Sequence, residues 1–294
     1  TDASGRTDVC SYTVTVNDLQ DPTISCVGNQ IVSTDNNACT FTKSGTNWDA
    51  TGTDNCPDYV ITYALAGATT GNGSSLDGVV FNKGLTTVTW TNTDASGRTD
   101  VCSYTVTVND GQDPTISCVG NQTVNTDNNT CTYTKSGTDW DATGNDNCPN
   151  YVITYALAGA TTGNGSSLDG VIFNKGVTTV TWTNTDASGR TDVCSYTVTV
   201  SDGQDPTISC VENQTVNTDN NLCTFTKSGS DWDATGNDNC PDYVITYALS
   251  GATTGNGSSL DGVAFNKGLT TVTWTNTDAS GRTDVCSYTV TVND

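Results

Sequence analysis

Residues 86–108 read TTVTWTNTDASGRTDVCSYTVTV, and this stretch decides the fold. Thr86–Asn92 alternates with period two, so Val88 and Trp90 fall on one face and Thr87, Thr89 and Thr91 on the other. Cys102–Val108 alternates in the same way and places its cysteine, tyrosine and two valines on one face. The turn residues Asp94–Arg98 lie between the two runs. The stretch therefore predicts a hairpin of two half-buried strands.

Three earlier segments are also typical of short strands: Thr23–Cys26, Cys39–Lys43 and Tyr59–Leu65, separated by Asn, Asp and Gly. No segment shows the 3.6-residue apolar period of a helix. Short strands that each have one exposed face indicate an all-β fold in which two sheets stack as an immunoglobulin-like sandwich. We expect the two tryptophans of each copy, such as Trp48 and Trp90, to fill the core.

The chain is an array of near-identical copies. The string TDASGRTDVCSYTVTV starts at Thr1, Thr93, Thr185 and Thr277, a period of 92 residues (93 − 1). The sequence thus predicts tandem immunoglobulin-like sandwiches arranged as beads on a string, and we expect the array to continue beyond both ends. The predicted boundaries are 1–18 for the final strand of a preceding, truncated repeat, and 19–110, 111–202 and 203–294 for repeats 1, 2 and 3.

Composition excludes several classes of function. The 294 residues include 10 Lys and Arg against 32 Asp and Glu, a net charge of -22, which argues against a nucleic-acid partner. The absence of His removes imidazole catalysis. Every carboxylate pair is copied three times in turn segments, so we expect no enzyme. No apolar run is long enough to span a bilayer in this segment.

Four sequence signatures in order resemble a hyalin repeat. They are Asp113–Cys118, Asp146–Cys148, Thr185–Gly189 and Cys194–Val200. This resemblance implies an extracellular module with an immunoglobulin-like sandwich fold. Near-identical, Thr- and Asp-rich arrays of such modules look like the giant cell-surface adhesins of Bacteroidetes, including the SprB-type gliding adhesins. The resemblance therefore implies a role in cell adhesion or gliding motility at the cell surface.

The 13 cysteines fall four to a repeat, with Cys10 left over. None forms a CxxC pair and no His accompanies them, so they predict disulfides in an oxidising compartment rather than zinc sites. Side-chain parity in the first and last strands pairs Cys26 with Cys102, and elimination then pairs Cys39 with Cys56. The rival is a bond across the linker from Cys10 to Cys26, and a peptide joining Cys102 to Cys118 would be evidence for it. The predicted bonds are Cys26–Cys102, Cys118–Cys194, Cys210–Cys286, Cys39–Cys56, Cys131–Cys148 and Cys223–Cys240.

The aspartates suggest a structural cation. In an immunoglobulin-like sandwich the linker before a repeat, the loop after its second strand and its last hairpin turn lie at the same end, so their carboxylates converge. Oxygen ligands without sulfur or imidazole suit Ca²⁺. The alternative is that these aspartates only stabilise turns and keep the chain soluble. The candidate calcium ligands are Asp110, Asp113, Asp141, Asp146 and Asp186, with their equivalents Asp18, Asp21, Asp49, Asp54, Asp94, Asp202, Asp205, Asp233, Asp238 and Asp278.

Two functions from different classes are compatible with this pattern. The first is structural: a stalk or filament segment that projects an adhesive tip or serves gliding. Its expected partners are neighbouring repeats and identical chains of a filament, with a glycan or surface ligand at the tip. The alternative is that the repeats themselves bind glycan or protein through many weak contacts. Gly120 becomes Glu212 in the next copy, but no loop is hypervariable, which favours the spacer. The lone leading strand Val9–Val16 leaves exchange of this strand between chains open.

Overall fold

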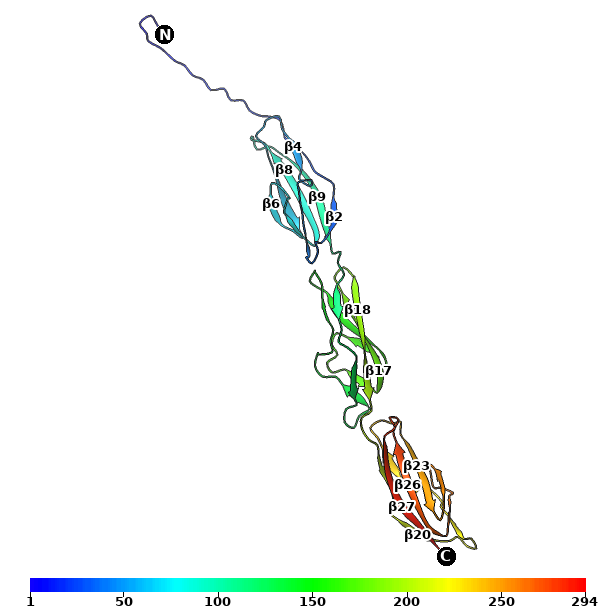
Figure 1. Ribbon diagram of the computed structural model, residues 1–294. Helices are drawn as coiled ribbons and strands as arrows, with labels where there is room; N and C mark the ends of the chain where they lie inside the picture. The colour runs from blue at the N-terminus through cyan, green and yellow to red at the C-terminus, as the bar shows by residue number, and fades with distance from the viewer. The chain divides into compact units, whose positions relative to one another are not determined.

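The computed structural model describes residues 1–294 and contains 27 β-strands and no helix (Figure 1). The all-β fold with tandem two-sheet sandwiches is therefore confirmed. Repeat 1 contains β1 (Thr23–Ser25), β2 (Gln30–Ser33), β3 (Thr40–Thr42), β4 (Thr51–Thr53), β5 (Val60–Gly67), β6 (Gly71–Gly73), β7 (Val80–Asn82), β8 (Gly84–Thr93) and β9 (Thr99–Asn109).

The other two repeats have the same strands at equivalent positions. Repeat 2 contains β10 (Thr115–Ser117), β11 (Gln122–Asn125), β12 (Thr132–Thr134), β13 (Thr143–Asn145), β14 (Val152–Gly159), β15 (Gly163–Gly165), β16 (Ile172–Asn174), β17 (Gly176–Thr185) and β18 (Thr191–Ser201). Repeat 3 contains β19 (Thr207–Ser209), β20 (Gln214–Asn217), β21 (Thr224–Thr226), β22 (Thr235–Asn237), β23 (Val244–Gly251), β24 (Gly255–Gly257), β25 (Ala264–Asn266), β26 (Gly268–Thr277) and β27 (Thr283–Asn293).

One face of each sandwich is a five-stranded sheet built on the predicted hairpin. In repeat 1 its order is β2-β9-β8-β5-β6, with β2 parallel to β9 and the other pairs antiparallel. The register places Trp90 opposite Cys102. The carboxylate of Asp94 closes the hairpin turn, because it accepts the backbone N–H groups of Ser96 at 2.9 Å and Arg98 at 2.7 Å.

The second layer consists of two short antiparallel pairs, β1–β4 and β3–β7 in repeat 1. The core lies between the layers, where Val88, Trp90 and Val106 are fully buried. Trp48 packs against the ring of Phe41 with the centroids 5.6 Å apart. Each of the three cores draws its side chains from one repeat only, and both tryptophans of a repeat lie in it as predicted.

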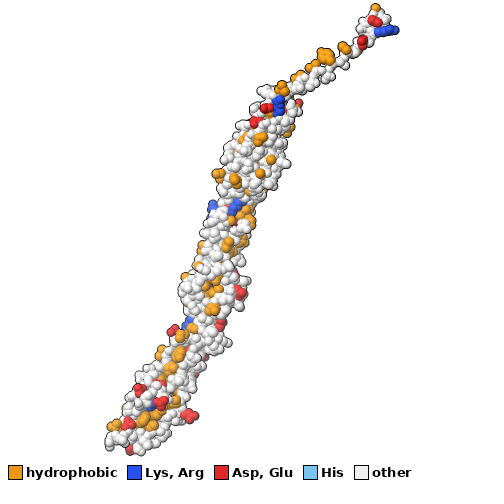
Figure 2. Space-filling view, turned by 180° about the vertical axis from the view of Figure 1, so that it is seen from behind, with side chains coloured by type: hydrophobic (Ala, Val, Ile, Leu, Met, Phe, Trp, Pro, Cys, Tyr) orange, Lys and Arg blue, Asp and Glu red, His pale blue; other side chains and the backbone are white.

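Residues Thr1–Asp18 repeat the sequence of Thr277–Asp294 but form no strand. In repeat 3 that sequence forms β27, which pairs with β20 on one edge and with β26 on the other. The leading segment has no such partners in this chain, so its apolar side chains are exposed (Figure 2). Val16, for example, is 89% exposed. The predicted final strand is therefore not formed here.

Loops of repeat 2 pack with repeat 1. The chain divides into two compact units, and the first combines Thr1–Thr115 with Asn145–Val152 and Thr185–Thr191. These two segments are the loop after β13 and the turn between β17 and β18. No helix in the structure is long and apolar enough to span a bilayer.

A buried tyrosine in each repeat predicts sensitivity to alkali. The hydroxyl of Tyr196 donates to the backbone oxygen of Trp140 at 2.7 Å, and burial raises the pKa of Tyr196 to about 12. Tyr104 and Tyr288 have the same bond and the same raised pKa, about 12. The folded state therefore favours the protonated phenol. This stability is fully present below the unfolded pKa of about 10 and is lost as the pH rises towards 12.

We expect the triple variant Y104F/Y196F/Y288F to be less stable than the parent at neutral pH, by about 1 kcal/mol per repeat for the lost hydrogen bond. Between pH 10 and 12 its stability should fall less steeply, because no buried phenol remains to ionise. Urea unfolding followed by tryptophan fluorescence across this range measures both effects. Tyr12→Phe, at an exposed tyrosine, is the control. Equal slopes for parent and triple variant would contradict the prediction.

Candidate cation site at the repeat junctions

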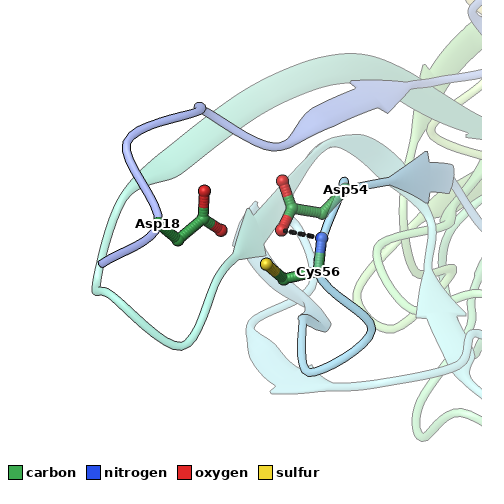
Figure 3. Close-up of side chains that lie close together, drawn as sticks. All are labelled: Asp18, Asp54 and Cys56. Carbon is green, nitrogen blue, oxygen red and sulfur yellow. Dashed lines mark hydrogen bonds between the residues drawn. The ribbon is translucent and has the colours of Figure 1, made fainter. Parts of the chain in front are cut away.

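Two aspartates from successive repeats meet at each junction. Asp110, directly after β9, lies beside Asp146 in the loop after β13, and their carboxylate oxygens and the sulfur of Cys148 are within 4.8 Å of one another. The same cluster recurs at Asp202, Asp238 and Cys240. It also occurs before repeat 1, where Asp18, Asp54 and Cys56 point toward one another (Figure 3).

Asp110 is buried as an ion. Its side chain is 0% exposed, and Lys83 of the preceding repeat lies 3.2 Å from Oδ2. The backbone N–H of Gln112 donates to Oδ1 at 3.3 Å. Burial opposes the ionisation of Asp110, but the Gln112 N–H and the Lys83 ammonium outweigh burial and hold its pKa below the usual value. Asp110 is therefore a carboxylate at neutral pH, partly neutralised by a lysine.

Several oxygens of the junction loops are buried and have no hydrogen-bond partner. Oδ2 of Asp146 accepts the N–H of Cys148 at 3.0 Å, but Oδ1 of Asp146 is unpartnered. Asp186 uses Oδ1 to close the hairpin turn and leaves Oδ2 unpartnered, and Oδ1 of Asn147 is unpartnered as well. A buried acceptor without a partner costs about 1 to 3 kcal/mol, more for a charged group. Such oxygens are the ligands that a hard cation prefers.

Two of the five predicted positions have other partners. Asp113 is exposed and forms an ion pair with Arg190 at 2.8 Å. Asp141 accepts the hydroxyl of Ser167 at 2.7 Å and the N–H of Leu168 at 2.8 Å, so it closes a loop of its own repeat. The equivalent aspartates have equivalent partners. Asp21 forms an ion pair with Arg98, and Asp205 with Arg282. Asp49 accepts hydrogen bonds from Ser75 and Leu76, and Asp233 accepts them from Ser259 and Leu260.

Asp186 belongs to a turn that touches the junction. The ammonium of Lys83, which contacts Asp110, also donates to the hydroxyl of Ser188 at 3.0 Å. This turn has the same internal bonds at Asp94 and Asp278, whose Oδ2 atoms are likewise buried and unpartnered. The structure thus brings Asp110 and Asp146 together and joins the turn of Asp186 to them through a lysine.

The disulfides link repeats as well as strands. Cys26 is bonded to Cys102, and the equivalent bonds are Cys118–Cys194 and Cys210–Cys286, the pairs given by strand parity. The predicted pairs Cys39–Cys56, Cys131–Cys148 and Cys223–Cys240 are wrong. Instead Cys39 is bonded to Cys148 of the next repeat, and Cys131 to Cys240. Cys10, Cys56 and Cys223 are free thiols.

The reason for the correction is the position of Cys39 in its repeat. The turn before Cys39 adjoins the following linker, because the side-chain amide of Gln112 donates to the backbone oxygen of Asp35 at 3.0 Å. Cys56 lies at the other junction, beside Asp18. Elimination paired two cysteines that face different neighbours. The hydrogen bond to Asp18, followed by burial and nearby carboxylates, raises the pKa of the Cys56 thiol.

Polar contacts accompany each inter-repeat disulfide. The side-chain amide of Asn147 donates to the backbone oxygen of Ala38 at 2.8 Å, and that of Asn239 donates to the backbone oxygen of Thr130 at 2.8 Å. Sequence reasoning missed Lys83, Gln112 and Asn147. Nearly every position recurs with the 92-residue period, so the repeat itself does not distinguish junction residues from the rest.

No protein-family model matches the chain. The sequence is similar to hyalin of Strongylocentrotus purpuratus, with 28% identity over 313 residues that cover 99% of this chain and 22% of hyalin. The chain thus spans about a fifth of the length of this relative. Among solved structures it is similar to mouse cadherin-23 EC22-24 (17% identity, TM-score 0.35, 93% of this chain and 99% of that one). It is also similar to Drosophila N-cadherin EC1-4 (15% identity, TM-score 0.32, 95% and 76%). At these TM-scores the cadherin likeness carries no functional argument.

The inter-repeat bonds are directly testable. After digestion of the oxidised chain with trypsin and Asp-N under non-reducing conditions, we expect mass spectrometry to find Cys39 linked to Cys148 and Cys131 linked to Cys240. Free thiols should map to Cys10, Cys56 and Cys223 after alkylation. The control is the same digest after reduction, which should release every linked peptide. A peptide joining Cys131 to Cys148 would contradict the pairing.

Proposed function

We propose that this chain is a segment of the stalk or filament of an extracellular cell-surface adhesin, in which repeats add length. The observation that carries the proposal is that the junction between repeats 1 and 2 and the junction between repeats 2 and 3 have equivalent disulfides, linkers and asparagine contacts. Such a junction couples each sandwich to the next. Near-identical copies are suited to a spacer, because no copy needs its own specificity.

Other features support this assignment. The disulfides require an oxidising compartment. The similarity to hyalin along the whole chain supports a hyalin-repeat-like, extracellular module. We propose 19–110, 111–202 and 203–294 as the module boundaries. Because the repeats are nearly identical and Thr- and Asp-rich, we further propose that the parent protein belongs with giant bacterial adhesins of the SprB type, which serve gliding in Bacteroidetes.

We propose that Ca²⁺ binds at each junction and helps hold the two repeats together. Asp110 and Asp146 would supply carboxylate oxygens. Further donors would be the unpartnered oxygens of Asn147, next to Asp146 in the sequence, and of Asp186, whose turn Lys83 joins to Asp110. This donor set contains only oxygen, because the sulfur of Cys148 is in a disulfide. The Lys83 ammonium beside Asp110 lowers the local negative charge, which favours weak binding over tight binding.

The spacer proposal predicts an extended particle in solution. Three sandwiches with strands of this length add about 40 Å each, so small-angle scattering should give a radius of gyration near 35 Å, as for a rod of about 120 Å. A compact single globule of 294 residues would have a radius of gyration of about 19 Å. The oxidised full chain with its free thiols alkylated is the sample. The compact value would overturn the spacer function.

The calcium proposal predicts a shift in thermal stability. Extracellular modules bind Ca²⁺ with dissociation constants of about 0.1 to 1 mM, so 10 mM Ca²⁺ should stabilise each site by about 1.4 to 2.7 kcal/mol relative to EGTA. The double variant D110N/D146N should lose the effect at the first junction. Asp242→Asn is the matched control, since repeat 2 already has Asn150 at that exposed position. Equal melting temperatures in Ca²⁺ and EGTA for the parent chain would exclude the ion.

A further inference from the structure

Repeat 2 is covalently bonded to both neighbours through disulfides as well as through its linkers. In repeat 2, Cys148 is bonded to repeat 1 and Cys131 to repeat 3. Only seventeen residues of backbone separate these two cysteines (148 − 131). A force that enters repeat 2 through one bond can therefore leave through the other without crossing the rest of the repeat. We name this path, residues 131–148 with its two disulfides, the loop route.

A second short path runs through the disulfides within the repeats. Cys102 is bonded to Cys26, and sixteen residues later Cys118 is bonded to Cys194 (118 − 102). Another sixteen residues lead to Cys210, which is bonded to Cys286 (210 − 194). We name this path, residues 102–118 and 194–210 with the three disulfides, the linker route. It follows the ends of β9 and β18 in the five-stranded sheets and then β10 and β19 in the other layer, whereas the loop route follows β12 and β13 in that other layer.

The loop route is also anchored to the core. Lys135 is 3% exposed, although it carries a charge, and its ammonium lies 5.1 Å from the Trp140 ring and 2.6 Å from Asp139. The backbone oxygen of Trp140 accepts the hydroxyl of Tyr196. Asp169 accepts the N–H of Gly137 at 2.6 Å. These contacts hold residues 131–148 in place inside the sandwich, so tension on the two cysteines is shared with the packed core.

We infer that the array carries tension along two parallel covalent routes, one through the loop cysteines and one through the linkers, so that a pulled repeat cannot unravel to its full length. The biological use of these routes rests on the proposed spacer function. The routes give that spacer a fixed maximum length. A repeat of 92 residues would extend to about 320 Å without cross-links, whereas the loop route limits it to about 60 Å. Either route alone prevents full unravelling, so the loss of one disulfide is tolerated.

The test is the contour length of the oxidised chain, pulled from its two termini by peptide handles with free thiols alkylated. In the oxidised parent chain the shortest covalent path between the termini contains about 65 residues, which extend to about 230 Å. After reduction the whole chain should extend to about 1,000 Å. The variant C118S/C194S removes the linker route from repeat 2. The loop route should then limit the length to about 92 residues, or about 320 Å.

Other lengths overturn the inference. If the loop route does not form, C118S/C194S should extend to about 490 Å, and if Cys131 pairs with Cys148 inside the repeat, to about 430 Å. The matched control replaces Cys39, Cys131, Cys148 and Cys240 by serine, which leaves the linker route and should leave the parent length of about 230 Å unchanged. A longer control would show that the linker route is absent.

Two further outcomes separate this inference from related failures. Should C118S/C194S fail to fold, the linked peptides of the parent chain decide, since the absence of a Cys131–Cys240 peptide removes the loop route. A chain with the expected contour lengths but a compact shape in scattering would retain both routes and refute the spacer function alone. An extended chain that reaches 490 Å in the variant would retain the spacer and refute the loop route.

Discussion

The disulfide between successive repeats is the constraint on which the junction depends. The Cα atoms of Cys39 and Cys148 are 4.7 Å apart, so the bond holds the turn before β3 against the loop after β13 of the next repeat. That loop carries Asp146 and Asn147. Once it is fixed, Asp146 has to lie beside Asp110, and the amide of Asn147 reaches Ala38. The polar contacts of the junction thus follow from one covalent bond.

This constraint also explains how like charges are held together in a chain with a net charge of -22. Two carboxylates within 4.8 Å repel each other, and a flexible junction would relax by moving them apart. The disulfide and the linker prevent that movement. Lys83 neutralises Asp110 in part, and the oxygens of Asp146 and Asp186 without partners leave a deficit of positive charge. A bound cation would remove this deficit, and water would remove it only partly.

The sequence was sufficient for the sandwich but not for the junction. Alternation in residues 86–108 predicts the hairpin of β8 and β9, and it predicts the inward cysteine at position 102, because side-chain parity is a local property. The short strands β2, β4, β6 and β7 were missed. Asp110 and Asp146 were expected to converge from the fold. Asp113 and Asp141 bond instead to Arg190 and Ser167, partners that are set by loop geometry and that the sequence pattern does not indicate.

The pairing of Cys39 shows why elimination within a repeat fails. In an unfolded chain, closing the 17-residue loop to Cys56 is favoured over closing the 109-residue loop to Cys148 by about 1.6 kcal/mol of loop entropy. Local sequence therefore favours the wrong bond. The folded repeat reverses this preference, because Cys39 adjoins the linker that follows and Cys56 the linker that precedes. Cysteines that oxidise in the folded repeat are therefore directed to the bond between repeats, whereas oxidation of the unfolded chain favours the bond within one repeat.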